Sequence, residues 1–257
     1  MVDISVVCPT YNSADFIDRT LDSVLSQKTL PKEVIIVDDG SSDSTIARLE
    51  TYRDRFANQK VELKILQQTN QGPGAARNNG ISNATSQWIA FLDSDDTWHT
   101  DKIHKVLESI NTNPKANFVV HWEEHQKIDG TKSLIRNGHG IRQDNISRQI
   151  YLKNPISTSA VCVKKDILDM VGGFNTSLPV SQDYDLWLKL AEHMKIEVIS
   201  EALGTYIDRA NNITSRPYYW KLRFILRILY SHRHKVSSLD YCYKLLRTFV
   251  CRAWLPS

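Results

Sequence analysis

Acidic residues gather at two points of the chain, each directly after a run of apolar residues. Asp38 and Asp39 follow Val34–Val37, and the segment Asp93–Asp96 follows Trp88–Leu92. In an open parallel sheet, ligands bind beyond the carboxyl ends of the strands, which meet at one edge. Carboxylates crowded at that edge repel one another unless a cation or a polar ligand compensates them. The sequence therefore predicts a ligand site there.

Asp93 and Asp95 are the strongest candidates for binding a cation. Carboxylate oxygens suit Mg²⁺ or Mn²⁺, which bridge them to phosphate oxygens. An EF-hand calcium loop starting at Asp93 is excluded, because it would need glycine in place of Trp98 and glutamate in place of His104. Aspartates in turns can also simply cap the next helix, and we prefer that interpretation for Asp43.

A glycine-rich segment, Asn70–Asn78, follows the third predicted strand. It matches a GxGxxG phosphate loop only in part, since Arg77 stands in place of the third glycine. Neither a Walker A sequence nor the GxSxG turn of hydrolases is present. The guanidinium fork of Arg77 suits phosphate oxygens, so we predict a phosphate or nucleotide contact. A solvated arginine on a helix surface is the alternative.

Strands and helices alternate in the first half of the chain. Apolar β-branched runs predict buried strands, and apolar residues spaced three and four apart predict helices. The expected strands are Ile4–Val7, Val34–Val37, Val61–Leu66 and Trp88–Leu92, and the expected helices lie around Ile17–Leu25, Ile46–Phe56, Gly74–Ala84 and Ile103–Ile110. This alternation implies an α/β fold with a mostly parallel central sheet flanked by helices.

The pattern is less regular after Asn113. We expect a strand at Phe118–Trp122, a hairpin turn at Asp129–Gly130, a helix at Asp183–His193 and one or two helices in the tail Tyr218–Trp254. The predicted division is one domain over residues 1–215, with halves 1–112 and 113–215, and a basic helical tail over residues 216–257.

Composition excludes several classes of protein. The 257 residues carry a net charge of +3, which does not by itself indicate nucleic-acid binding. The four cysteines form no CxxC pair, so neither a disulfide framework nor a zinc site is expected. We see no signal peptide and no apolar run near the ~20 residues that span a bilayer. A cytoplasmic protein is therefore expected.

Five segments together resemble glycosyltransferase family 2, whose members have the GT-A fold. They are VVCPTYNSADFIDRTLDSVLSQ, VIIVDDGSSDST, NQGPGAARNNGI, WIAFLDSDDTW and SQDYDLWLKLA, in this order between Ile4 and Thr214. Each segment alone is moderately specific, whereas all five in order at the family's spacing are highly specific. The resemblance implies an inverting glycosyltransferase that uses a nucleotide-sugar donor.

The same resemblance implies roles for residues on the donor side. Pro9, Tyr11 and Asp39 would line the pocket for the nucleotide base, most often uracil. Asp93, the first residue of the family's Asp-x-Asp motif, would contact the ribose or the metal. Asp95 would coordinate the metal, Mn²⁺ or Mg²⁺.

On the acceptor side, Asp183 matches the aspartate of the family's Glu-Asp motif, which is the catalytic base of inverting members. Gln182 replaces the glutamate. A base is needed to take the proton of the attacking hydroxyl, although an acid that only stabilises a helix N-terminus is the alternative. Arg209 stands where many members carry a histidine, and its charge could stabilise a leaving diphosphate. On the donor side, beside Asp95, Asp96 is an additional candidate metal ligand.

The expected reaction moves a sugar, with a UDP-sugar as the preferred donor, to a hydroxyl of a glycan or lipid-linked acceptor. Polysaccharide, O-antigen or other cell-surface glycans are the expected products. Two alternatives stay open. A sugar-phosphate nucleotidyltransferase would also use an aspartate-bound metal, but it carries a glycine-rich basic loop where Pro9–Asn12 stands. A non-catalytic module of this fold should have lost Asp95 or Asp183, and both are present.

The tail mixes aromatic and aliphatic residues with many arginines and lysines, and Asp240 is its single acid. One interpretation is a helical appendage whose apolar face packs on the domain. The other is peripheral contact with the anionic inner face of a membrane. There each Lys or Arg contributes about 1 kcal/mol, and Trp and Phe favour the interface.

Overall fold

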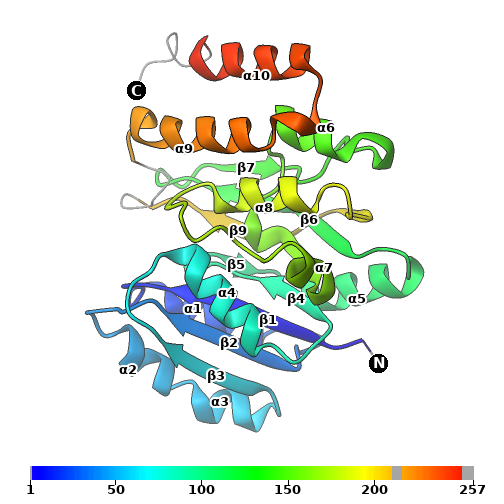
Figure 1. Ribbon diagram of the computed structural model, residues 1–257. Helices are drawn as coiled ribbons and strands as arrows, with labels where there is room; N and C mark the ends of the chain where they lie inside the picture. Colours follow the sequence, from blue (N-terminus) through cyan, green and yellow to red (C-terminus); the bar gives the residue numbers. More distant parts are fainter. Residues whose placement is uncertain (1, 210–215, 251–257) are drawn as a thin grey trace.

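The computed structural model describes residues 2–209 and 216–250. Its N-terminal half alternates strands and helices as the sequence predicts (Figure 1). The elements are β1 (Ile4–Thr10), α1 (Ile17–Leu25), β2 (Glu33–Asp38), α2 (Thr45–Glu50), α3 (Arg53–Asn58), β3 (Glu62–Gln67), α4 (Pro73–Asn83), β4 (Trp88–Phe91), β5 (Thr97–Trp98) and α5 (Lys102–Thr112).

The C-terminal half is more irregular and ends in two tail helices. It contains β6 (Phe118–Gln126), β7 (Lys132–Ile135), η1 (Gln143–Asn145), α6 (Ile146–Leu152), η2 (Thr158–Ala160), β8 (Val161–Lys164), α7 (Lys165–Met170), α8 (Gln182–Leu190), β9 (Ile196–Ile207), α9 (Tyr218–Ser231), η4 (Arg233–Lys235) and α10 (Ser238–Val250). The predicted hairpin turn joins β6 to β7, with Gly130 at a φ of 82°. The strand at Phe118, the helix at Asp183 and two tail helices are confirmed.

One sheet runs through both halves, in the order β3-β2-β1-β4-β8-β6-β9-β5, with β7 paired to β6. Strands β3, β2, β1 and β4 are parallel, as predicted. Beyond β4 the sheet is mixed, because β8 runs antiparallel to both β4 and β6, whereas β6 and β9 are parallel. The α/β fold is confirmed, and the parallel prediction holds for the N-terminal half of the sheet.

The sheet separates two hydrophobic cores, because successive side chains of a strand point to opposite faces. In β1, Val7 belongs to one core, whereas Val6 and Cys8 belong to the other. In β2, Ile35 belongs to the same core as Val7, and Val34 belongs to the same core as Val6. Helices cover both faces, which explains why these strands are apolar throughout.

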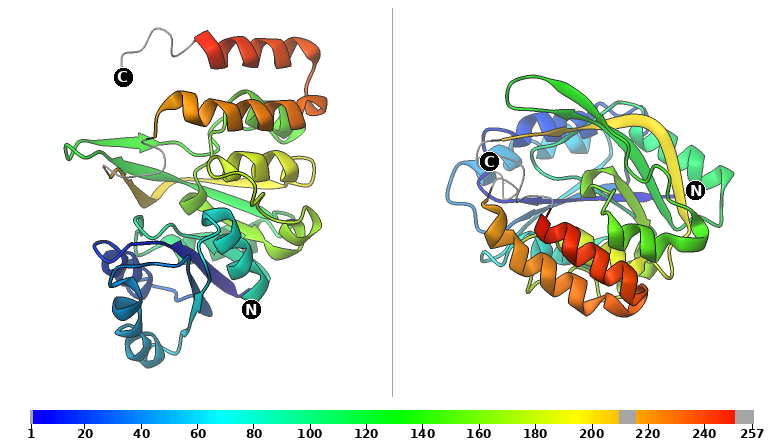
Figure 2. Two further views of the ribbon diagram at one scale, coloured as in Figure 1. Left: turned by 60° about the vertical axis from the view of Figure 1, so that its left-hand side comes forward. Right: turned by 90° about the horizontal axis from the view of Figure 1, so that it is seen from above.

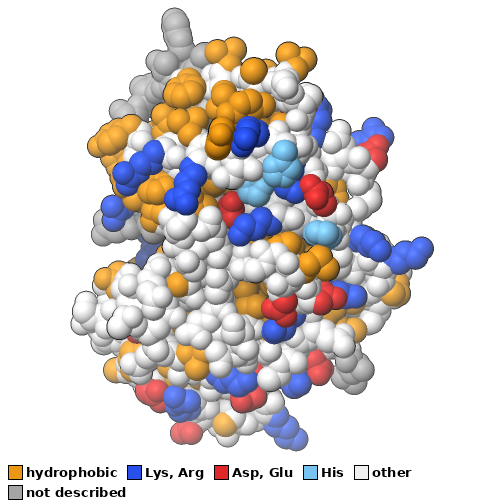
Figure 3. Space-filling view, in the orientation of Figure 1, with side chains coloured by type: hydrophobic (Ala, Val, Ile, Leu, Met, Phe, Trp, Pro, Cys, Tyr) orange, Lys and Arg blue, Asp and Glu red, His pale blue; other side chains and the backbone are white. Residues whose placement is uncertain are grey.

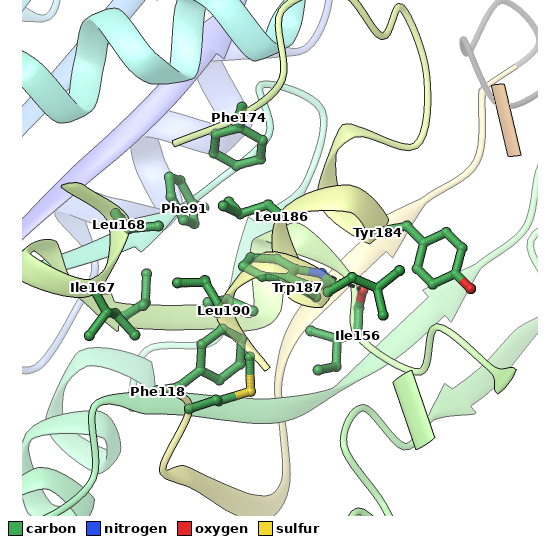
Figure 4. Packing of buried hydrophobic residues seen from close by; sticks show 14 of the residues in the cluster. Phe91, Phe118, Ile156, Ile167, Leu168, Phe174, Tyr184, Leu186, Trp187 and Leu190 are labelled. Carbon is green, nitrogen blue, oxygen red and sulfur yellow. Dashed lines mark hydrogen bonds between the residues drawn. The ribbon is translucent and has the colours of Figure 1, made fainter. Parts of the chain in front are cut away.

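The larger core fixes α8 against the middle of the sheet. Trp187 of α8 meets Phe118 of β6 edge to face, with ring centroids 5.2 Å apart (Figure 4). Phe91 of β4 meets Phe174 in the same manner at 5.4 Å. These aromatic contacts hold the start of α8, where Asp183 lies, in a fixed place beside β4.

A single helix across Ile46 and Phe56 was expected, and that expectation is wrong. The chain turns at Thr51 and Tyr52, so that two short helices, α2 and α3, form instead. The turn allows the buried Tyr52 hydroxyl to donate a 3.0 Å hydrogen bond to Asp22 of α1. Tertiary packing therefore overrides the helical period at this point.

Helix α4 lies unusually close to β1 at Gly80. A Cβ atom built on Gly80 would lie 2.5 Å from Cγ1 of Val7 and 3.4 Å from Cγ2 of Val37. Asn78 of the same helix accepts a 2.8 Å hydrogen bond from the Phe174 backbone N–H and donates one of 2.8 Å to the Phe174 carbonyl. The absence of a side chain at position 80 therefore lets α4 touch both the parallel strands and the segment before α8.

Replacing Gly80→Ala should push α4 away from β1. The added methyl group overpacks the contact with Val7, and the better helix propensity of alanine offsets only part of that cost. We expect a loss of about 1–2 kcal/mol in the free energy of unfolding, measured by urea denaturation. Ser82→Ala, on the exposed side of the same helix, is the control and should change stability little. Wild-type stability in the Gly80 variant would show that α4 is not fixed by this contact.

Candidate active site

The two predicted acidic clusters meet at the carboxyl edge of the parallel strands. The backbone N–H of Asp39 donates a 2.8 Å hydrogen bond to the carbonyl of Thr10, at the end of β1. The backbone N–H of Leu92 bonds to the carbonyl of Val7 at 3.1 Å, so Asp93 follows directly beside β1. The sequence argument for one shared edge is therefore confirmed by the strand pairing.

Asp93 pairs with Arg77, which α4 brings across this edge. The guanidinium Nη2 lies 2.6 Å from Oδ1 of Asp93, and the arginine side chain is only 8% exposed. The Phe174 ring packs against the guanidinium, with the ring centroid 5.3 Å from Cζ. Nε of Arg77 is buried and has no hydrogen-bond partner within the described chain. Arg77 is thus a buried, incompletely satisfied cation and not a solvated surface arginine.

Asp95 pairs with Arg209, which follows β9. Nε and Nη2 of the arginine lie 2.6 and 2.5 Å from the same carboxylate oxygen, Oδ2. The guanidinium also stacks over Phe16, 4.1 Å from the ring centroid. Burial and the neighbouring Asp93 carboxylate raise the pKa of Asp95, whereas the Arg209 charge opposes that rise. The charge of Asp95 is therefore balanced by the charge of Arg209.

Asp96 is directed into the protein. Its Oδ2 accepts a 2.6 Å hydrogen bond from Ser159 of η2, and its Oδ1 accepts a 3.1 Å bond from the backbone N–H of Ile207. Burial and the carboxylates of Asp95 and Asp93 raise the pKa of Asp96 well above its ordinary value. Because both oxygens have protein partners, Asp96 is less suited to ligand binding than Asp93 or Asp95.

The residues expected around a nucleotide base lie on the neighbouring strands. Pro9 is buried within β1, and Tyr11 is 51% exposed just beyond it. Asp39 is buried, and its carboxylate accepts hydrogen bonds from the backbone N–H groups of Gln71 and Gly72 at 2.9 and 2.7 Å. Asp39 therefore fixes the glycine-rich loop, whereas Tyr11 offers a free aromatic face at the same edge.

Asp183 lies at the start of α8, beside the start of α4. A Cβ atom on Gly74 of α4 would lie 3.4 Å from Cγ of Gln182, so the two helix starts touch. Burial raises the pKa of Asp183, and the positive charge of Arg77 opposes the rise. The candidate base therefore lies within the electrostatic reach of the arginine that holds Asp93.

Two further polar residues complete the site, and the sequence analysis missed both. Asn154 donates a 3.3 Å hydrogen bond to Oδ2 of Asp183, while its own Oδ1 is buried and has no partner in the described part of the chain. Ser159 bonds to Asp96 and also accepts a 3.1 Å hydrogen bond from the backbone N–H of Asp93. Both lie in irregular segments where no periodic pattern marks a functional residue.

The carboxylates fit a cation whose other ligands come from a substrate. No group of three or more His, Cys, Asp or Glu side chains in residues 2–209 and 216–250 could hold a metal ion. Asp95 and Asp93 nevertheless each keep one carboxylate oxygen without a hydrogen bond to the described chain. One or two carboxylates combined with phosphate oxygens are a common arrangement around Mg²⁺.

The profile of the family described as Glycosyl transferase family 2 matches residues 5–171. An uncharacterized glycosyltransferase of Haemophilus influenzae is 31% identical over 191 residues, which are 74% of this chain and 62% of that protein. Chondroitin synthase of Escherichia coli is 29% identical over 194 residues, which are 74% of this chain and 26% of the relative. The chain thus spans only part of the length of these relatives.

Solved structures share the fold over nearly the whole chain. The S. aureus TarS fragment 1–349 in complex with UDP-GlcNAc has a TM-score of 0.70 and 25% identity, covering 96% of this chain and 73% of that one. The mannosyltransferase PcManGT of Pyrobaculum calidifontis, in complex with GDP-Man and Mn²⁺, has a TM-score of 0.70 at 16% identity, covering 98% and 71%.

The fold, a mixed sheet flanked by helices, agrees with these glycosyltransferase structures and confirms the GT-A expectation. The matched region includes β1 and β4, whose carboxyl ends carry the candidate donor residues. By fold and sequence together, the chain belongs to glycosyl transferase family 2.

Proposed function

We propose that the chain transfers a sugar from a nucleotide-diphosphate donor to a hydroxyl group of a glycan or lipid-linked acceptor, with inversion of the anomeric centre. The observation that carries this proposal is the presence of two separate acid sites beside α4. Asp93 and Asp95 face arginines at the strand ends. Asp183, which has no arginine ion pair among the described residues, lies where α8 meets α4. A single displacement needs a charge-stabilising site for the leaving group and a separate base.

The donor would lie across the carboxyl edge of β1, β2 and β4. Tyr11 is free to pack against a base, with Pro9 and Asp39 forming the floor of that pocket. Arg77 and Arg209 would face the diphosphate, since both guanidinium groups already lie at this edge. A UDP-sugar is the donor to test first, because the structurally similar TarS fragment binds UDP-GlcNAc. The link between similar proteins and chondroitin synthesis supports a polysaccharide product.

Asp95, with Asp93 beside it, would hold Mn²⁺ or Mg²⁺ through the carboxylate oxygens that accept no hydrogen bond from the described residues. A divalent cation at this point would neutralise the charge that develops on the leaving diphosphate. For Asp95 to contribute both oxygens, Arg209 must leave it. The arginine would then be available to the phosphate oxygens. Mn²⁺ is the first cation to test, because a mannosyltransferase of the same fold contains it beside GDP-Man.

Asp183 would act as the general base. Its carboxylate takes the proton of the acceptor hydroxyl while the acceptor oxygen attacks the anomeric carbon. The bond from that carbon to the phosphate oxygen breaks, and its electron pair leaves with the diphosphate. Asn154 would orient the Asp183 carboxylate through their hydrogen bond. Burial, which raises the pKa of Asp183, makes it a stronger base than an exposed aspartate.

Asp95→Ala should abolish turnover of the nucleotide sugar and weaken Mn²⁺-dependent binding of UDP. The measurements are release of nucleoside diphosphate from a panel of nucleotide sugars, and calorimetry with UDP and Mn²⁺. Asp15→Ala, which removes an exposed acid before α1, is the control and should behave as wild type. Equal metal-dependent affinity in the Asp95 variant and wild type would refute the proposed donor site. Release of pyrophosphate from a nucleoside triphosphate and a sugar phosphate would instead indicate a nucleotidyltransferase.

Asp183→Asn should keep donor binding and lower kcat by about 100-fold or more, because a general base contributes on that scale. The base works only when deprotonated, so activity must fall as pH drops through its pKa. Since that pKa is raised, the acid limb of the kcat/KM profile should lie above the range of an ordinary aspartate. The limb should disappear in the variant. An acid limb that persists in Asp183→Asn, or a product with the donor's own configuration by NMR, would contradict this role.

Arg209→Gln should separate cation binding from catalysis. Removing the guanidinium frees Asp95, so Mn²⁺ should bind the nucleotide-free protein more tightly, on the order of tenfold, while kcat falls. Mn²⁺ affinity can be followed by electron paramagnetic resonance of the free ion. Arg19→Gln is the matched control, because among the described residues Arg19 donates to the backbone carbonyl of Asp95, at 3.0 Å, and not to its carboxylate. Unchanged Mn²⁺ affinity in Arg209→Gln would show that the arginine does not compete with the cation.

A further inference from the structure

Helix α10 turns an apolar stripe away from the protein. Leu239, Tyr243, Leu246 and Phe249 are 80%, 53%, 63% and 53% exposed, respectively. Their spacing of four, three and three residues places them along one side of the helix. The structure therefore exposes four large hydrophobic side chains in a row, which is uncommon on a protein surface that has no partner.

The inner side of α10 already has its own contacts, so the stripe is not needed for packing. Leu245 and Tyr241 pack against the larger hydrophobic core. Lys244 donates a 2.9 Å hydrogen bond to the carbonyl of Leu152 in α6, and Tyr218 of α9 donates one of 2.6 Å to the carbonyl of Thr248. Both interpretations of the tail are thus compatible, since one side of the helix packs and the other does not.

The tail around the stripe is strongly basic. Asp240 is the single acid between residues 216 and 250, and Arg148 of α6 neutralises it through a 2.7 Å ion pair. Five arginines of this region are exposed, namely Arg216, Arg223, Arg227, Arg233 and Arg247. Figure 3 shows hydrophobic side chains gathered with Lys and Arg on the part of the surface formed by α9 and α10. Apolar and basic groups therefore share one end of the molecule.

We propose that α9 and α10 rest on an anionic lipid bilayer, with the α10 stripe entering the headgroup region. Charge complementarity selects this occupant. A second copy of the chain would bring exposed arginines against exposed arginines, which is unfavourable at an interface. An anionic bilayer supplies both an apolar layer for the stripe and negative charge for the arginines. Among the described residues no helix has the length and apolar character to cross a membrane, so the contact is peripheral.

The position of the helices relative to the candidate base connects this surface to the proposed function, on which this step rests. Tyr151 of α6 donates a 2.8 Å hydrogen bond to the carbonyl of Leu229 in α9. Lys244 of α10 contacts the carbonyl of Leu152, at the end of α6. Asn154, which contacts Asp183, lies only two residues further along the chain. Figures 1 and 2 show α9 beside α6, with α8 on one side of α9 and α10 on the other. A lipid-linked acceptor held in the bilayer would thus be presented from the Asp183 side of the molecule.

Co-sedimentation of the full chain with vesicles tests the proposal. The vesicles contain either phosphatidylcholine alone or phosphatidylcholine with phosphatidylglycerol, at low and high salt. We expect binding to the anionic vesicles at low salt and loss of that binding at high salt. Leu246→Asp should reduce the lipid partition coefficient on the order of tenfold or more, and so should Arg223→Gln combined with Arg227→Gln.

Ile128→Asp is the matched control, because Ile128 is 70% exposed in the turn between β6 and β7 and the substitution adds the same charge. It should bind vesicles as wild type does. Absence of binding at low salt, or equal binding by Leu246→Asp and wild type, would overturn the proposal. A concentration-dependent dimer in light scattering that Leu246→Asp dissociates would assign the stripe to a second copy and overturn it as well.

The Leu246→Asp variant also separates this inference from the proposed function. Leu246 lies on the outer side of α10, away from the candidate donor and base residues. The variant should therefore hydrolyse a nucleotide sugar at the wild-type rate in detergent-free solution while failing to bind vesicles. Loss of both properties in a folded variant, checked by circular dichroism, would contradict a purely lipid-binding role for the stripe.

Discussion

Three carboxylates within four residues at the end of β4 are the constraint on which the rest of the site depends. They cannot remain charged together unless each is compensated separately. Arg77 holds Asp93, Arg209 holds Asp95, and Asp96 turns inward to a serine and a backbone N–H. The compensating groups come from α4, from the end of β9 and from η2. Compensating the repulsion within this one short segment therefore requires groups from three distant parts of the chain, which meet at the same place.

Helix α4 connects the two sides of the site. Its arginine faces the strand ends, its Asn78 holds the segment that leads to α8, and Gly80 allows it to lie directly on β1. A displacement of α4 would change the distance between the donor carboxylates and Asp183. The rate of sugar transfer would depend on this distance, because the reacting groups must be correctly oriented before the bond to the leaving group breaks.

The two tail helices combine structural and exposed surfaces. Ile228 and Leu229 of α9 are fully or almost fully buried in the larger core, so α9 belongs to the folded body. His232, directly after α9, forms a buried 2.9 Å hydrogen bond with Asp185, two residues after the candidate base. The tail thus stabilises α8, whereas the outer side of α10 is exposed among the described residues. Arg252 and Trp254, which were part of the predicted tail, lie outside the described residues.

The sequence by itself determined the alternation of strands and helices and the shared edge of the acids, whereas the roles of Asp93, Asp95 and Asp183 are predictions that the family resemblance implies. These follow from local patterns, since apolar periodicity and motif spacing involve residues close in the chain. Only the tertiary structure decided the mixed half of the sheet, the inward turn of Asp96, the pairing of Asp95 with Arg209 and the contact of Asn154 with Asp183. Each of these joins segments that are far apart in sequence, and packing between them leaves no periodic signal in either segment.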